Sequence, residues 1–217
     1  MSAQRNEGNR PMRPQRLAIT LAVSCVALAA AASAAPGQMT AQEARAYLQA
    51  AGIAVLPDSL PQVIITGDDK AVDALIAAGL DVNAKGSLPQ SPLELAAMSC
   101  AGGRVAPAVT AHMMDSLIAA GANPNAPGIQ GLGPLMLAAQ QCDAAVIKRL
   151  VAAGAKLDSR TPQGFTPLSM ALIVKNYSAA EALVDAGARI SPEVGQKLTE
   201  GSNDQRLKDL VTRATGT

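Results

Sequence analysis

The apolar positions of the chain recur at helical spacing, in a unit that returns along the sequence. Each unit opens with Pro-Leu and further leucines and alanines, and a second run of Leu, Ile, Val and Ala ends at a glycine. The openings are residues 91–97, 133–139 and 166–172, and the closing glycines are Gly79, Gly121, Gly154 and Gly187. An apolar residue at every third or fourth position is typical of an α-helix with one buried face. The pattern therefore predicts pairs of short helices.

The closing glycines define the period of the repeat. The last two intervals between them are equal, and the first is longer, although the step from a closing glycine to the next unit's proline never changes. The extra residues of the first interval therefore lie between Ala97 and Gly121. Because Gly102, Gly103 and Pro107 interrupt helices, we expect an inserted loop at 98–111. A fixed period within the range of roughly 20–50 residues indicates a solenoid, whose units are stable only when stacked.

These units resemble the ankyrin repeat. Residues 166–168, Thr-Pro-Leu, match the family's helix start, and residues 75–83, LIAAGLDVN, match its ending. Ser169 stands where the family has His, and the other two units carry Glu94 and Met136 there. The resemblance implies an all-α solenoid of stacked helix-turn-helix units, joined by β-hairpin-like finger loops. We use "finger" for the loop between one unit's closing glycine and the next unit's proline.

The two ends of the array differ from the repeat. We expect a signal peptide at 1–34, a linker and N-terminal helix at 35–56, an ankyrin-repeat domain of about four units at 57–190, and C-terminal capping helices at 191–217. At the far end, Ser191 and Pro192 start a helix without a full finger before it. The last expected helix surrounds a few apolar residues with polar ones, as a terminal unit requires.

The composition changes this picture in two respects. Hydrophobic residues are 49% of the 217-residue chain but aromatic residues only 1%, so the core must consist of small aliphatic side chains. The segment 1–34 holds four of the 18 basic and one of the 17 acidic residues, which leaves the remainder with a net charge of −2. Without a basic stripe or rings for stacking, nucleic-acid binding is disfavoured. We expect a monomer whose partner is an unidentified protein.

The segment 1–34 has the pattern of an export signal. Four arginines precede an apolar run from Leu17 to Ala31, and Ala32-Ser33-Ala34 supplies the small residues of a cleavage site. An uncleaved anchor is one alternative, although the run is shorter than the roughly 20 residues that span a bilayer. A lipid anchor at Cys25 is another. We expect cleavage, a periplasmic mature protein and no membrane contact after signal removal.

Two cysteines remain in the mature chain, Cys100 and Cys142, at equivalent places in adjacent units. Stacked helices lie about 8–10 Å apart, whereas disulfide formation requires Cα atoms within about 7 Å. The insertion beginning at Cys100 supplies the missing movement, so we favour a disulfide in an oxidising compartment. Two buried thiols, or a metal or redox role, are the alternatives. Closing a loop of this length adds roughly 4 kcal/mol of stability in the chain-entropy model.

Catalytic and metal chemistry have little support. His112 is the only histidine, no nucleophile-elbow motif is present, and one His with two separated Cys lacks zinc-site spacing. The glycine-rich stretch 128–133 is explained by the repeat, because Gly131 and Gly164 occupy the same finger position. We therefore expect no enzyme activity, no metal and no cofactor.

The finger tips are the candidate binding surface. In the family that these units resemble, the residue two before the repeat proline projects from the finger and often contacts partners. These residues, with their neighbours on the second and third fingers, are Gln90, Leu132, Phe165, Ile129, Gln130, Arg160 and Gln163. An apolar anchor beside polar and Arg residues is the composition of a binding hot spot. Alternatively, Phe165 and Leu132 only pack finger against finger. The inserted loop, with Arg104 and His112, is a second candidate surface.

The sequence thus predicts a non-enzymatic scaffold in the periplasm that binds a partner through its finger loops and concave face. An immunity or stress-protective factor, which inhibits a toxin or shields an enzyme in the same compartment, is the alternative. Neither the partner nor the role of the insertion follows from the sequence.

Overall fold

The structure is a computed structural model and describes residues 39–216, of which all from Ala41 onward fall in one compact unit. The signal peptide expected at 1–34 lies outside the described residues. Within the described part all regular structure is helical, with no strand. No helix among these residues combines the length and apolar character needed to cross a membrane.

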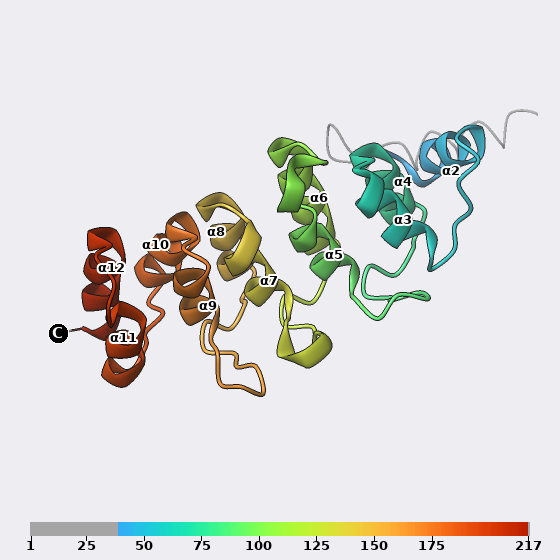
Figure 1. The fold of residues 1–217 in the computed structure, drawn as a ribbon. Helices are drawn as coiled ribbons and strands as arrows, with labels where there is room; N and C mark the ends of the chain where they lie inside the picture. Colours follow the sequence, from blue (N-terminus) through green and yellow to red (C-terminus); the bar gives the residue numbers. More distant parts are fainter. Residues whose placement is uncertain (1–38, 217) are drawn as a thin grey trace, which may run out of the picture. The chain divides into compact units, whose positions relative to one another are not determined.

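After α2, the helices follow one another in pairs along the unit (Figure 1). The α-helices are α2 (Ala41–Ala50), α3 (Ser59–Thr66), α4 (Asp69–Ala77), α5 (Pro92–Met98), α6 (Pro107–Ala119), α7 (Pro134–Gln141), α8 (Ala144–Ala152), α9 (Pro167–Ile173), α10 (Tyr177–Asp185), α11 (Pro192–Thr199) and α12 (Gln205–Thr215). Two 3-10 helices, η1 (Ala101–Gly103) and η2 (Ile129–Gly131), lie in the connections.

The helices form two parallel rows. Helices α3, α5, α7, α9 and α11 pack one on the next in an inner row. Helices α2, α4, α6, α8, α10 and α12 do the same in an outer row. Each inner helix also packs on the outer helix that follows it in the chain, from α3 on α4 to α11 on α12. This arrangement confirms the all-α solenoid of stacked helix pairs.

The start of each inner helix follows from its first residues. Helices α5, α7, α9 and α11 begin with proline, which needs no hydrogen-bond partner at this position. Ser91 N donates to Glu94 Oε2 at 2.6 Å while Glu94 N donates to Ser91 Oγ at 3.3 Å. Thr166 and Ser169 form the same reciprocal capping box in α9. The residues that replace the family's histidine thus close capping boxes in two of the units.

The Glu94 side chain also fixes the residue that faces it. Glu94 is 1% exposed, and its Oε1 has no hydrogen-bond partner within the described structure. A Cβ at Gly128 would lie 2.5 Å from that oxygen and 2.2 Å from the Leu132 carbonyl oxygen. Glycine is therefore required at 128 by close approach.

Polar clamps join successive units behind the fingers. Asn83 Nδ2 donates to the Gly121 carbonyl at 3.0 Å, and Asn83 Oδ1 accepts from Asn123 N at 2.8 Å. Asn125 repeats both bonds one unit later, with Gly154 O at 2.9 Å and Lys156 N at 2.8 Å. Each Asn stands four residues after its closing glycine. At the third joint this place holds Asp158, whose carboxylate cannot donate.

The insertion differs from the loop that the sequence predicts at 98–111. Only residues 99–106, including η1, lie between helices, and Pro107 begins α6. Helix α6 has 13 residues, whereas α4, α8 and α10 each have nine. Pro107 occupies the first helical position, where proline favours a helix instead of breaking it. Part of the insertion therefore lengthens the outer helix.

A disulfide joins Cys100 to Cys142, with a Cα–Cα distance of 5.2 Å. Cys100 follows the end of α5, and Cys142 caps the end of α7. The bond therefore ties the insertion to the next inner helix, as the favoured interpretation of the two cysteines predicts.

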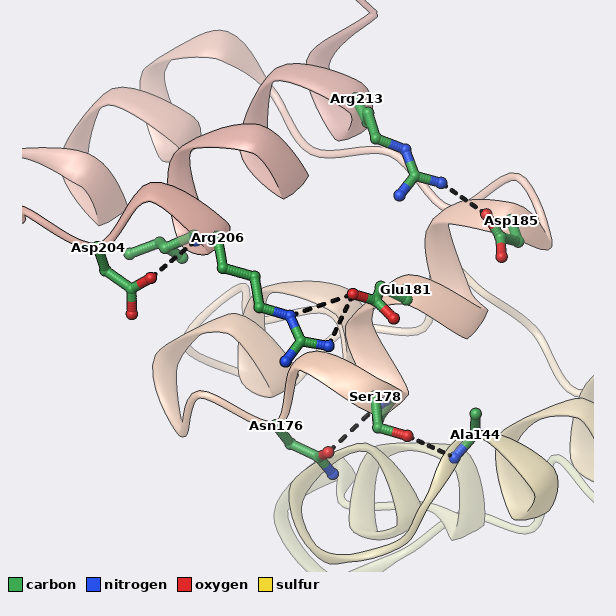
Figure 2. A network of polar contacts seen from close by, with 10 residues as sticks. Ala144, Asn176, Ser178, Glu181, Asp185, Asp204, Arg206 and Arg213 are labelled. Carbon is green, nitrogen blue, oxygen red and sulfur yellow. Dashed lines mark hydrogen bonds and ion pairs between the residues drawn. The ribbon is translucent and has the colours of Figure 1, made fainter.

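The C-terminal pair completes the stack. Helix α12 buries Leu207, Leu210, Val211 and Ala214. Two ion pairs tie its outer side to α10, Arg206 with Glu181 at 2.8 Å and Arg213 with Asp185 at 2.7 Å (Figure 2).

Replacement of Asp158 by Asn should stabilise the protein. The new amide can donate to the Gly187 carbonyl and complete the third clamp, which we expect to add about 0.5–1 kcal/mol to the free energy of unfolding. Urea unfolding of Asp158→Asn, beside Asn125→Asp as a variant that loses the equivalent donor, measures this. An unchanged unfolding midpoint in Asp158→Asn would show that the side chain at 158 does not face the Gly187 carbonyl as Asn83 and Asn125 face theirs.

Loss of the disulfide should destabilise the stack. Because the bond closes 42 residues of sequence separation, we expect Cys100→Ser/Cys142→Ser to lower the free energy of unfolding by up to about 4 kcal/mol. Denaturant unfolding with and without dithiothreitol gives the comparison. Reductant should destabilise the wild type and leave the variant unchanged, and a wild type insensitive to reductant would refute the expectation.

Candidate functional site

The second and third fingers have different backbones. In the third, Gly164 N donates to Thr161 O at 2.8 Å and Thr161 N donates to Phe165 O at 3.0 Å, which makes a tight hairpin-like turn. The second is instead a 3-10 turn, η2, in which Gln130 has a φ of 54°. The resemblance to a β-hairpin therefore does not extend to the second finger, where close approach to Glu94 confines the backbone at Gly128.

Each finger packs on the element beside it. A Cβ at Gly131 would lie 3.1 Å from Thr161 Cα, so the second finger touches the third backbone to backbone. On the first finger, Ser87 N and Oγ both donate to Asp58, and these bonds lower the pKa of that carboxyl. The third finger is thus in direct contact with the second, and the first is tied to the residue that precedes α3.

The predicted finger residues differ in exposure. Phe165 is 39% exposed and Ile129 47% exposed. Gln130, Arg160 and Gln163 are also exposed, whereas Gln90 and Leu132 are half-buried.

Three of the predicted residues, Arg160, Gln163 and Phe165, share one hollow of about 350 Å³ between the third finger, α9 and α11. The full set of lining residues is Arg160, Gln163, Gly164, Phe165, Thr166, Ser169, Ile173, Arg189, Ile190, Ser191, Val194, Lys197 and Leu198. We call it the terminal hollow. Gln90, Leu132, Ile129 and Gln130 do not line it.

The terminal hollow exists because a finger is missing. Only the segment 188–191 separates Gly187 from Pro192, whereas the whole segment 155–166 separates Gly154 from Pro167. The third finger therefore has no finger after it. The second finger has one side covered by the third. The corresponding side of the third finger, beside Phe165, is left open.

The terminal hollow carries positive charge. Arg160, Arg189 and Lys197 line it, and no Asp or Glu does. None of these three cations belongs to the ion pairs found among the described residues. Arg189 Nη1 donates to the Ala188 carbonyl at 2.9 Å, which places its guanidinium without neutralising it.

The sequence interpretation missed the α11 side of the hollow. Val194 and Lys197 fall in the segment expected to form capping helices and Arg189 at the end of the expected repeat domain, and the sequence predicts none of them as part of a binding surface. The short step from Gly187 to Pro192 is the signal that would have indicated them.

The second candidate surface has a structural contact at its centre. His112 Nε2 and Asp73 Oδ2 are 2.8 Å apart, and Ser116 Oγ donates to Asp73 Oδ1 at 2.6 Å. His112 and Ser116 thus bond to the same carboxylate, which ties α6 to α4. The hydrogen bond to Asp73 raises the pKa of His112 above its usual value. Arg104, which precedes His112 in the sequence and lies on the insertion, is also exposed.

No group of three or more His, Cys, Asp or Glu within residues 39–216 is placed to hold a metal ion.

Comparison with known proteins supports the repeat. Residues 105–193 match the family model described as ankyrin repeats, in three copies. No curated protein matches the chain. The matched segment begins in the insertion and ends in the first turn of α11, so it includes most of the terminal hollow.

The His112–Asp73 contact should make stability depend on pH. Because the folded-state pKa of His112 is raised, its stabilisation is complete below about pH 6.5, the ordinary value, and is lost as the pH rises through the folded-state pKa. Asp69 and Asp115 act on the ring in the same direction as Asp73. The pair is largely exposed, so we expect a loss of about 0.5 kcal/mol between pH 5.5 and 9.

Urea unfolding at the two pH values, for wild type and His112→Gln, tests this contact. The variant should lack the part of the pH dependence due to His112. An identical pH difference in both proteins would show that the contact contributes nothing.

Proposed function

Residues 105–193 belong to the ankyrin-repeat family, and from this premise we propose that the protein is a non-enzymatic scaffold that binds another protein. Ankyrin repeats are protein-binding scaffolds. The observation that carries the proposal is the terminal hollow, where the only phenylalanine of the chain is exposed among unpaired cations. The third finger and the inner helices beside it supply the contact surface.

The fold supports this role because it holds the surface in place before binding. Phe165 sits in a finger closed by two backbone hydrogen bonds, and Val194 lies on a helix packed against α12. A preorganised surface loses little conformational entropy on association. An aromatic anchor with Arg neighbours is the composition that dominates binding energy at interfaces.

We further propose that the protein works in an oxidising compartment, most simply a bacterial periplasm. Two observations support this location. The first is the arginine-rich start followed by an apolar run and Ala32-Ser33-Ala34. The second is the Cys100–Cys142 disulfide, since such bonds persist in oxidising compartments.

Capture of the partner tests the proposed function. The mature protein, immobilised, should retain a specific protein from periplasmic extract, and Leu132→Ala/Phe165→Ala should lose it by about tenfold or more. A matched control is Leu56→Ala/Ile65→Ala, because these side chains are 56% and 53% exposed and lie away from the second and third fingers.

The captured protein also decides between roles. A toxin or enzyme that loses activity in the complex would favour an inhibitory or protective factor. If the wild type retains no protein, or if the finger variant and the control retain it equally, the proposed use of these fingers is wrong.

A further inference from the structure

We propose that the terminal hollow is the docking site for an acidic segment of a partner protein that inserts an apolar side chain beside Phe165. This inference rests on the proposed function and specifies the chemistry of the partner. It commits to one occupant, a short stretch of Asp and Glu with an interspersed aliphatic residue.

The shape of the hollow follows from the missing finger. The second finger contacts the third through Gly131 and Thr161, but no finger follows the third. A segment of partner chain laid along the third finger would therefore take the place that a fourth finger fills in a regular array. The hollow already has one wall from the finger and a second from α11.

The wall formed by α11 is held firmly. Gly195 is buried, and a Cβ there would lie 2.8 Å from Val211 Cγ1 on α12. This close approach fixes α11 against α12, while Val194 and Lys197 line the hollow. The backbone of this wall is therefore fixed before binding, which reduces the entropy lost on association.

The charge of the hollow selects an acidic occupant. Arg160 comes from the third finger, Arg189 from the segment that precedes α11 and Lys197 from α11 itself, and no carboxylate lines the hollow. Guanidinium groups bind carboxylates through charge-assisted hydrogen bonds. A nucleic-acid backbone would also be attracted, but it requires a longer basic track and stacking rings, and the chain beyond residue 34 carries a net charge of −2 with 1% aromatics overall.

Apolar side chains lie among these charges. Phe165, Ile173 and Val194 are 39%, 44% and 38% exposed, and all three line the hollow. An apolar side chain of the partner would cover them and exclude water from the neighbouring ion pairs. A purely acidic peptide would leave these apolar side chains in contact with water. A sequence that contains both acidic and aliphatic residues therefore fits best.

A defined peptide tests the inference directly. The probe is a fluorescein-labelled decapeptide of six glutamates and four leucines, titrated with the mature protein by fluorescence anisotropy. The comparison peptide has lysine in place of every glutamate. We expect binding of the acidic peptide only, weakened about tenfold or more by Arg160→Glu/Lys197→Glu and by a rise in salt from 50 to 300 mM.

A charge-matched variant controls for net charge. Lys70→Glu/Lys148→Glu reverses two exposed lysines on α4 and α8, away from the hollow, and should bind the peptide within about twofold of wild type. Phe165→Ala should weaken binding while circular dichroism and the unfolding midpoint stay unchanged.

Three results of the peptide titrations would overturn the inference. They are no binding of the acidic peptide, equal binding by wild type and Arg160→Glu/Lys197→Glu, and equal binding of the lysine peptide. Self-association of the wild type that Arg160→Glu/Lys197→Glu abolishes would assign the hollow to a second copy, and tighter binding of a single-stranded oligonucleotide than of the peptide would assign it to nucleic acid. Either outcome also overturns it.

The failure of this inference is distinguishable from that of the proposed function. If a protein captured from extract is lost by Leu132→Ala/Phe165→Ala but kept by Arg160→Glu/Lys197→Glu, the scaffold stands and the acidic specificity falls. If nothing is captured at all, the scaffold itself is in question.

Discussion

The close approach of neighbouring inner helices is the constraint on which this structure depends. Ala96, Ala138 and Ala171 lie on the successive inner helices α5, α7 and α9, which pack on one another, and all three are completely buried. Any larger side chain there would force the helices apart, and every later pair would shift with them. Because the chain has almost no aromatic residues, the core is built from closely packed Leu, Ile, Val and Ala. No helix pair has enough apolar surface to be stable alone.

Hydrogen bonds from polar side chains then fix how each unit is aligned with the next, which the packing of small aliphatic side chains does not determine alone. The Asn83 and Asn125 clamps hold two joints in the same geometry, each with one bond donated and one accepted. The third joint departs from this pattern twice, since Asp158 removes a donor and the following finger is absent. The binding surface that we propose lies at this joint. The repeat therefore supplies rigidity, and its interruption supplies an open, charged surface.

The features that depend on local sequence could be predicted, because periodicity, Pro at the helix start and Gly at the helix end act within one unit. The helix pairs and the capping helices follow from such signals. The bounds of the insertion are less predictable, because Pro107 favours an interruption in the sequence pattern, whereas in the structure the preceding Ala106 is extended and the proline begins a helix. Periodicity does not show whether a proline continues a loop or starts a helix.

The candidate site is less predictable for two reasons. Its residues belong to segments far apart in the chain, and its shape depends on the absence of a finger between Gly187 and Pro192. The register of the repeat is enough to place Arg160, Gln163 and Phe165 together, since these belong to one finger. It could not join them to Arg189 and Lys197, which lie beyond the last regular unit. It also grouped them with Ile129 and Leu132, which do not line the hollow.

The composition of the chain determines how such a surface can bind. With a single phenylalanine, the hollow offers little aromatic area, and small aliphatic groups alone discriminate weakly between partners. Electrostatic complementarity gives specificity and speeds association without a large interface. The field of three uncompensated cations extends about 8–10 Å at moderate salt. Because residues 35–217 carry a net charge of −2, the acidic partner that we propose is repelled elsewhere and attracted here, so charge steers it to the place where the repeat ends.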